Sequence, residues 1–221
     1  MIKVDLISRS IHLMGSTITI SILHEKADSL LDQVFSLLRL YEKRFSANDD
    51  SSELMQINHA AGKHPVCVHP DLFELIELGK KHSLAPDSHL NITLGPLIQT
   101  WRIGFADAKV PSPEEIKQAL SLTDPECIEL DAIASSVFLT MEGMKIDLGA
   151  LAKGYIADKI AAFLRGQGVT SALINLGGNI LTIGLNEKNN RYWRIGIQNP
   201  SLPRGNNLAL LSVQNQSVVT S

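Results

Sequence analysis

The sequence predicts an α+β fold with mainly antiparallel sheets and packed helices. Apolar residues recur at helical spacing in residues 25–45 and 149–166, whereas residues 11–23 alternate apolar and polar side chains. Strands that alternate in this way have one buried face, which favours antiparallel pairing over a parallel sheet covered on both sides. We find no internal repeat and no Pro/Ser-rich linker, so we expect a single domain over residues 1–221.

The first half of the chain predicts a β-hairpin followed by helices. Residues 2–7 and 11–23 are expected to form two half-buried strands, and residues 25–45 one long amphipathic helix. A short helix through residues 53–57 is expected next, with Asp50 or Ser51 as its N-cap. A brief strand over 64–69 then leads to a helix opened by Pro70, because proline is tolerated in a first helical turn.

The second half predicts paired strands and one further long helix. Ser112-Pro113-Glu114-Glu115 has the pattern of a capping box and predicts a helix to Leu122. Strands are expected at 128–130, 137–140, 145–148, 172–176, 193–200 and 208–213, the fifth of them ended by Pro200, with the long helix between the third and fourth. Cys67 and Cys127 lie singly in apolar stretches, so we expect buried thiols and no disulfide.

Composition limits the classes of partner. The 221 residues are 44% hydrophobic and 19% charged, which is typical of a globular protein, and no run of eighteen apolar residues predicts a membrane span. The net charge of −3, without a cluster of Lys and Arg, argues against nucleic acid, because duplex binding draws on phosphate neutralisation. We therefore expect small molecules or proteins as partners.

Polar residues and glycines interrupt the apolar pattern between Met144 and Gly184. Asp147 falls where a short strand meets the helix that begins near Gly149, and Lys153 lies in the first turns of that helix. A helix N-terminus presents unpaired N–H groups and can hold an anion. The pair Gly177-Gly178 allows a positive φ or a close approach of the backbone. From spacing alone, purely structural roles, a helix cap at Asp147 and an ordinary tight turn at the two glycines, remain as open as an anion-binding site.

Other common sites are absent from the sequence. It contains neither the glycine pattern of a Rossmann dinucleotide site nor that of a phosphate-binding Walker loop. No serine lies in a G-x-S-x-G motif, and the seven histidines have no zinc-type spacing. These absences leave the segment around Asp147 as the candidate site.

Two motifs carry a resemblance to a known family. The run I-D-L-G-A-L-A-K-G-Y-I-A-D, followed by I-N-L-G-G-N-I, resembles the central sequence of the ApbE family, the FAD:protein FMN transferases. Met14-Gly15-Ser16 and L-N-I-T-L-G-P-L-I-Q-T-W also match family stretches. The resemblance covers residues 14–221 and implies an α+β fold with mainly antiparallel pairing.

The resemblance also implies a set of ligand-binding residues. The FAD site would be lined by Met14, Asn48, His89, Leu90, Asn91, Asp147 and Lys153, and the Ala150 carbonyl would be a Mg²⁺ ligand. Three positions depart from the family pattern. Ser16 replaces a threonine, Asn91 replaces an aspartate, and Asn48 stands where a tyrosine commonly packs on the flavin ring.

The implied reaction is Mg²⁺-dependent transfer of FMN from FAD to a Thr or Ser hydroxyl of an acceptor protein, with release of AMP. Family members continue beyond Thr220-Ser221 with further metal ligands, so we expect a C-terminally incomplete domain whose catalytic residues are unknown. An FAD pyrophosphatase and an inactive FAD-binding protein are the alternatives. The N-terminus shows no signal core or lipid-anchor cysteine, which predicts a cytoplasmic chain; the alternative is an exported lipoprotein whose leader has been removed.

Overall fold

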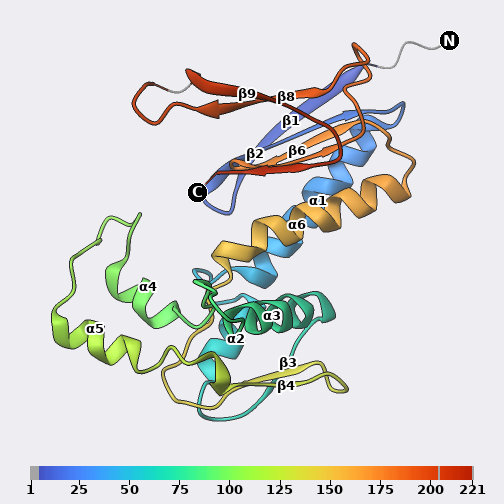
Figure 1. Cartoon of the computed structure of the whole chain (residues 1–221). Helices are drawn as coiled ribbons and strands as arrows, with labels where there is room; N and C mark the ends of the chain where they lie inside the picture. The colour runs from blue at the N-terminus through green and yellow to red at the C-terminus, as the bar shows by residue number, and fades with distance from the viewer. Residues whose placement is uncertain (1–4, 204, 221) are drawn as a thin grey trace. The chain divides into compact units, whose positions relative to one another are not determined.

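The computed structural model describes residues 5–203 and 205–220, which fall into two compact units. The first unit comprises residues up to Tyr41 and from Lys153 onward, and the second comprises Glu42–Ala152. The divisions fall inside helix α1 (Ala27–Phe45) and helix α6 (Gly149–Gly166), so each of these helices contributes residues to both units. Figure 1 shows the elements of each unit.

A five-stranded antiparallel sheet forms the first unit. Its strand order is β1-β2-β6-β7-β10, with the bounds β1 Leu6–Leu13, β2 Ser16–Leu23, β6 Ala172–Leu176, β7 Asn179–Ile183 and β10 Ser217–Val219. Ile18, Ile20 and Ile22 of β2 are fully buried, which is the outcome expected when β-branched side chains alternate along a half-buried strand.

A separate two-stranded sheet belongs to the same unit. Strand β8 (Trp193–Gln198) pairs antiparallel with β9 (Asn207–Val213). Trp193, Ile195 and Val213 form a small buried cluster, against which partly buried apolar residues of the five-stranded sheet pack: Leu6, Leu173, Ile180 and Val218. This cluster attaches the β8–β9 hairpin to the larger sheet.

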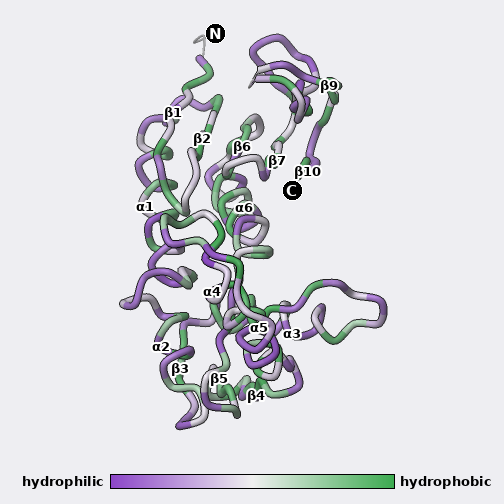
Figure 2. The backbone as a smooth tube through the Cα atoms, turned by 90° about the vertical axis from the view of Figure 1, so that its left-hand side faces the viewer, coloured by the Kyte–Doolittle hydropathy of each residue, from purple (hydrophilic) through white to green (hydrophobic). Residues whose placement is uncertain are grey.

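Helices α1 and α6 are amphipathic. Leu31, Val34 and Leu38 of α1 are fully buried, as are Ile160 and Leu164 of α6. Figure 2 shows hydrophobic and hydrophilic residues alternating along α1, as expected for a helix with one buried face.

The second unit is mainly helical. Its helices are α2 (Glu53–Ala60), α3 (Pro70–Ser83), α4 (Gly95–Trp101) and α5 (Pro113–Leu120), with one 3₁₀ turn at Pro125–Cys127. A three-stranded antiparallel sheet has the order β3-β5-β4, with β3 Val66–Cys67, β5 Ser136–Leu139 and β4 Ile128–Asp131. The capping box at Ser112 and Glu115 is present, so that prediction is confirmed.

The predicted fold class is confirmed, since every strand pair named above is antiparallel and helices pack with the sheets. No helix in the described part of the chain is long and apolar enough to cross a membrane.

Four local predictions were wrong. The first hairpin turns at Met14-Gly15, within the range expected as one strand, and residues 1–4 of the other predicted strand lie outside the described residues. Ser52, rather than Asp50 or Ser51, caps α2 by accepting a hydrogen bond from the Met55 N–H. The remaining two errors concern residues 145–148 and the cysteines.

Residues 145–148 form no strand, because the backbone N–H groups of Ile146 and Asp147 donate to the Asn58 side chain and to the Ile92 carbonyl instead of a neighbouring strand. Cys67 is exposed and Cys127 half-buried, since both lie on short elements with one open side. An apolar sequence context therefore did not predict their burial.

Candidate functional site

Two tight turns lie at one edge of the five-stranded sheet in the first unit. The β1–β2 turn contains Met14 and Gly15, at φ values of 52° and 67°. The β6–β7 turn contains Gly177 and Gly178, at 65° and 100°. Because β2 and β6 pair antiparallel, with Ile18 opposite Leu176, the start of β2 lies beside the end of β6. Both turns therefore meet at this edge.

Gly177 allows the β6–β7 turn to approach the Ser16 side chain closely, and any side chain at position 177 would block that approach. A Cβ at this position would overlap the Ser16 side chain and would lie 3.5 Å from the Nζ of Lys153. The turn is fixed by the Gly178 N–H, which donates to Asn175 Oδ1 at 2.9 Å. The side-chain amide of Asn179 lies near Gly154 of α6. Both features that the sequence allowed at these glycines, a positive φ in a tight turn and a close approach of the backbone, are therefore present.

Lys153 places a cation beside these turns. It is half-buried in the first turns of α6, and among the described residues its ammonium group has no hydrogen-bond or ion-pair partner. A half-buried ammonium group next to glycine turns is suited to binding an anion such as a phosphate. Of the predicted site residues, Met14 and Lys153 belong to this unit.

Asp147 lies in the second unit, immediately before α6. Its N–H donates to the Ile92 carbonyl at 2.8 Å, and its Oδ1 accepts from the Gly149 N–H at 2.8 Å. Asp147 thus satisfies the first N–H of α6 from the position before Leu148, whose carbonyl accepts the first intrahelical bond. The carboxylate is half-buried and uses one oxygen in this bond. Its other oxygen leaves acceptor capacity for a ligand hydroxyl or amide.

The bond to Ile92 brings the predicted segment 89–91 next to Asp147. Asn91 Oδ1 accepts from both the N–H and the hydroxyl of Thr93, at 2.8 and 2.6 Å, and Asn91 Nδ2 donates to the Thr123 carbonyl at 2.8 Å. The Asn91 side chain thus shapes its own loop, and His89 is exposed beside half-buried Leu90. The structure therefore joins Asp147 to Ile92, the residue after Asn91, and the described hydrogen bonds include none from Asp147 to His89, Leu90 or Asn91.

Asn48 lies in an exposed loop between α1 and α2 of the same unit. Its N–H donates to the Ser46 hydroxyl at 3.2 Å, and buried Ser52 donates to the Ser46 carbonyl at 2.6 Å. Hydrogen bonds from the hydroxyl and N–H of Ser51 lower the pKa of neighbouring Asp49. This loop carries a negative charge next to Asn48 and presents no aromatic ring there.

The described residues do not make a magnesium site. Ala150 is exposed in the first turn of α6 and could offer only its backbone carbonyl. Over residues 5–203 and 205–220, no group of three or more His, Cys, Asp or Glu side chains is arranged to hold a metal ion. Mg²⁺ prefers near-octahedral oxygen coordination, usually with carboxylates, so a single backbone carbonyl does not suffice to hold it.

Sequence reasoning missed two residues that shape these segments. Asn58 of α2 is 5% exposed, and its amide binds the backbone of Ile146 through two hydrogen bonds. Gly95 opens α4, where a Cβ would come within 2.6 Å of the Lys145 carbonyl. Only the polarity of Asn58 in an otherwise apolar helix face could have drawn attention to it.

Comparison with known proteins confirms the family. A sequence model described as the ApbE family matches residues 14–221, and the chain therefore belongs to this family. A protein of Klebsiella pneumoniae named FAD:protein FMN transferase is 44% identical over 214 residues, covering 97% of this chain and 65% of the relative. A protein of Treponema pallidum with the same name is 38% identical, covering 86% of this chain and 56% of the relative. The chain thus spans between about half and two thirds of these relatives' lengths.

Solved structures agree on the fold. The ApbE protein of Thermotoga maritima has a TM-score of 0.88 at 24% identity, covering 98% of this chain and 70% of that one. The flavin transferase ApbE of Vibrio cholerae has a TM-score of 0.86 at 22% identity, covering 97% and 71%. At these identities the likeness concerns the fold alone.

Proposed function

We propose that the chain transfers FMN from FAD to a Thr or Ser hydroxyl of an acceptor protein and releases AMP. One observation carries the proposal: the chain belongs to the ApbE family and is 44% identical, over 97% of its length, to a protein named FAD:protein FMN transferase. We further propose that residues 1–221 act as one flavin-transferase domain folded as two compact units.

We propose FAD-binding roles within each unit. In the first, the Lys153 ammonium group would contact phosphate oxygens beside the Gly177-Gly178 turn, because Lys153 adds a full charge and the glycines leave room for a close approach of the ligand. In the second, the Asp147 carboxylate would accept hydrogen bonds from hydroxyl or amide groups of FAD. The segment from His89 to Asn91 lies beside Asp147 and would shape that contact.

The proposed reaction is a substitution at phosphorus. The acceptor hydroxyl oxygen forms a bond to the FMN phosphorus, the phosphoanhydride bond to AMP breaks, and the hydroxyl proton passes to a base or to solvent. In such reactions the protein chiefly positions the groups and neutralises charge. Lys153 would supply part of that charge.

Magnesium enters the proposal only through the family resemblance. Ala150 is the one ligand that the resemblance implies within this sequence, and the described residues hold no cluster of three or more metal-ligating side chains, so a requirement for Mg²⁺ would involve further ligands from FAD, water or other residues. Loss of turnover in EDTA and recovery with Mg²⁺ would support this part. Unchanged turnover in EDTA would contradict the proposed requirement for Mg²⁺.

A second candidate, hydrolysis of FAD to FMN and AMP, is favoured by Asn48. This exposed amide cannot stack on a flavin ring as an aromatic side chain would. A loosely held FMN end would give water better access to the phosphorus. A binding protein without catalysis is the third candidate.

The products separate the three candidates. The chain is incubated with FAD and Mg²⁺ beside co-expressed candidate acceptor proteins, and intact masses are measured while AMP and FMN are followed by chromatography. Transfer predicts an acceptor heavier by one FMN ester, with AMP released in equal amount. Free FMN and AMP without an adduct would indicate hydrolysis, and bound FAD without turnover would indicate the binding protein.

A further inference from the structure

We infer that Asn58 is a positioning residue for the Asp147 carboxylate. The inference rests on the proposed function, in which Asp147 contacts FAD. Asn58 lies in α2, 88 positions from Ile146 in the sequence, and its side chain holds both backbone groups of that residue. Oδ1 accepts from the Ile146 N–H at 2.8 Å, and Nδ2 donates to the Ile146 carbonyl at 3.1 Å.

These two bonds replace the strand pairing that residues 145–148 lack. Ile146 is fully buried, so its N–H and carbonyl would be costly to leave without partners. The side-chain amide of Asn58 mimics a peptide group of a neighbouring strand, and only Asn or Gln offers a donor and an acceptor in that geometry. Asn58 is itself 5% exposed, so surrounding packing restricts its rotation.

The two hydrogen bonds between the Asn58 side chain and the Ile146 backbone, here called the Asn58 clamp, lie one residue before Asp147. The carbonyl of Ile146 and the N–H of Asp147 belong to the same peptide group. Asn58 holds the carbonyl end of this peptide, while the Ile92 carbonyl holds the N–H end at 2.8 Å. Two elements distant in sequence therefore fix its plane, and that plane sets the direction in which the Asp147 side chain leaves the backbone.

Met55 provides a matched control on the same helix. Its sulfur accepts a hydrogen bond from the same Nδ2 of Asn58 at 3.5 Å and is equally buried, but none of the hydrogen bonds described for Met55 reaches the 145–148 segment. Met55→Leu preserves volume and removes only this weak sulfur acceptor, while the two Ile146 bonds stay in place. It should change FAD affinity by less than about twofold.

The test is a double-mutant cycle on FAD affinity, measured by flavin fluorescence with the full chain. In the otherwise unaltered chain, Asn58→Ala should weaken FAD binding about tenfold. An effect of this size is within the range of interaction energies between residues of one hydrogen-bond network. In the Asp147→Ala background the same change should have less than a twofold effect, since no carboxylate remains to be positioned. Equal effects in both backgrounds would reduce Asn58 to a structural role and overturn the inference.

A second measurement does not depend on the variant folding. The Ile146 amide should exchange slowly with deuterium in the chain without FAD, because the clamp exists before the ligand arrives. Fast exchange that slows only when FAD is added would overturn the inference even if Asn58→Ala unfolds. If the unaltered chain binds no FAD, or Asp147→Ala binds it normally, the proposed function fails instead, and the Ile146 exchange rate separately reports whether the clamp is present.

Discussion

Gly177→Ala should destabilise the first unit strongly, and Gly15→Ala should do so weakly. The two glycines have nearly the same positive φ, 65° and 67°, so an alanine at either site has a similar backbone cost of roughly 1–2 kcal/mol. At Gly15 nothing lies within 4 Å of the new Cβ, whereas at Gly177 the Ser16 side chain occupies the space. Overpacking of this kind adds about 1–3 kcal/mol.

The expected total for Gly177→Ala is therefore about 2–5 kcal/mol, against about 1–2 for Gly15→Ala. For a chain of this size these losses correspond to falls in melting temperature of roughly 4–20 °C and 2–8 °C. Circular dichroism during heating and urea titration would measure both. Adding Ser16→Gly to Gly177→Ala should recover the overpacking part. Equal losses for the two alanine variants, or no recovery, would refute the close approach of the two turns.

Two further predictions concern exposed groups. Cys67 should react with a maleimide faster than Cys127, because it is the more exposed thiol, and equal rates by mass spectrometry would contradict this. The hydrogen bond from the Lys109 ammonium group, followed by that from the Ser112 N–H, lowers the pKa of the Glu115 carboxyl group. These bonds therefore stabilise the folded chain at pH values above the ordinary pKa of a glutamate. The stabilisation is lost as the pH falls through the lowered pKa. An NMR titration should show this pKa rising toward its usual value in Lys109→Met; no rise would contradict the pairing.

Local sequence patterns predicted most elements of the fold. Helices α1, α3, α5 and α6 follow from apolar spacing and from caps such as Ser112, which act over a few residues. The hairpin turn at Met14-Gly15 was missed because apolar alternation continues through it, and alternation does not distinguish one long strand from two short ones.

The candidate site was predicted only where a motif carried it. Asp147 and the Gly177-Gly178 turn were visible as interruptions of an apolar pattern. The partners that hold Asp147 in place, Asn58 and the Ile92 carbonyl, come from residues far away in the sequence. Such contacts depend on tertiary structure, and no local spacing encodes them.

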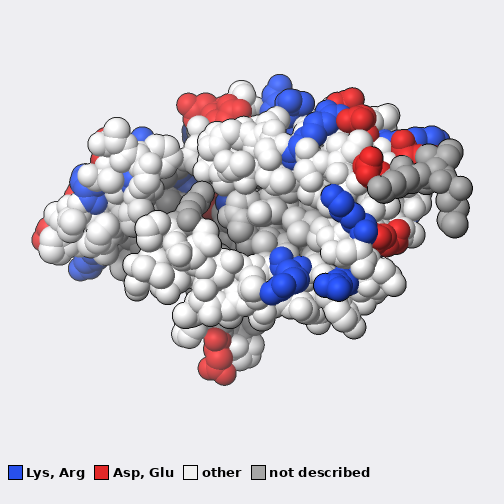
Figure 3. Space-filling view, turned by 90° about the horizontal axis from the view of Figure 1, so that it is seen from above, with Lys and Arg blue, Asp and Glu red and all other residues white. Residues whose placement is uncertain are grey.

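The distribution of charged residues along the sequence did not locate the candidate site. Acidic and basic side chains are both present on the face shown in Figure 3, among many uncharged residues. Lys153 is distinguished from the other lysines by the family motif in the sequence and, in the structure, by its place beside the Gly177 turn. A count of charges could not have selected it.

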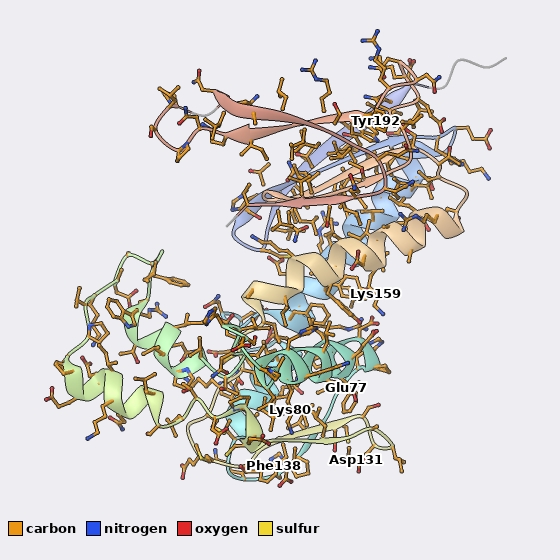
Figure 4. The ribbon with its side chains drawn as sticks, in the orientation of Figure 1. Glu77, Lys80, Asp131, Phe138, Lys159 and Tyr192 are labelled. Carbon is orange, nitrogen blue, oxygen red and sulfur yellow. The ribbon has the colours of Figure 1, made fainter. Side chains whose placement is uncertain are left out.

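FAD affinity of the chain and of Asp147→Ala is the measurement to make first, with Asp131→Ala as its control. Asp131, labelled in Figure 4, is exposed and likewise accepts a hydrogen bond from the N–H two residues on, at 2.9 Å, but it lies at the end of β4, outside the predicted site. Asp131 Oδ1 also accepts from the Ala134 N–H at 3.1 Å, so Asp131→Ala removes at least as much local hydrogen bonding as Asp147→Ala and controls for the loss of a turn carboxylate.

We expect saturable FAD binding to the unaltered chain, a loss of about tenfold or more in Asp147→Ala, as for a charge-assisted hydrogen bond to a ligand, and no change in Asp131→Ala. Fluorescence titration at equal protein concentrations gives all three constants. Equal affinity of Asp147→Ala and the unaltered chain would contradict the assignment of this segment to FAD.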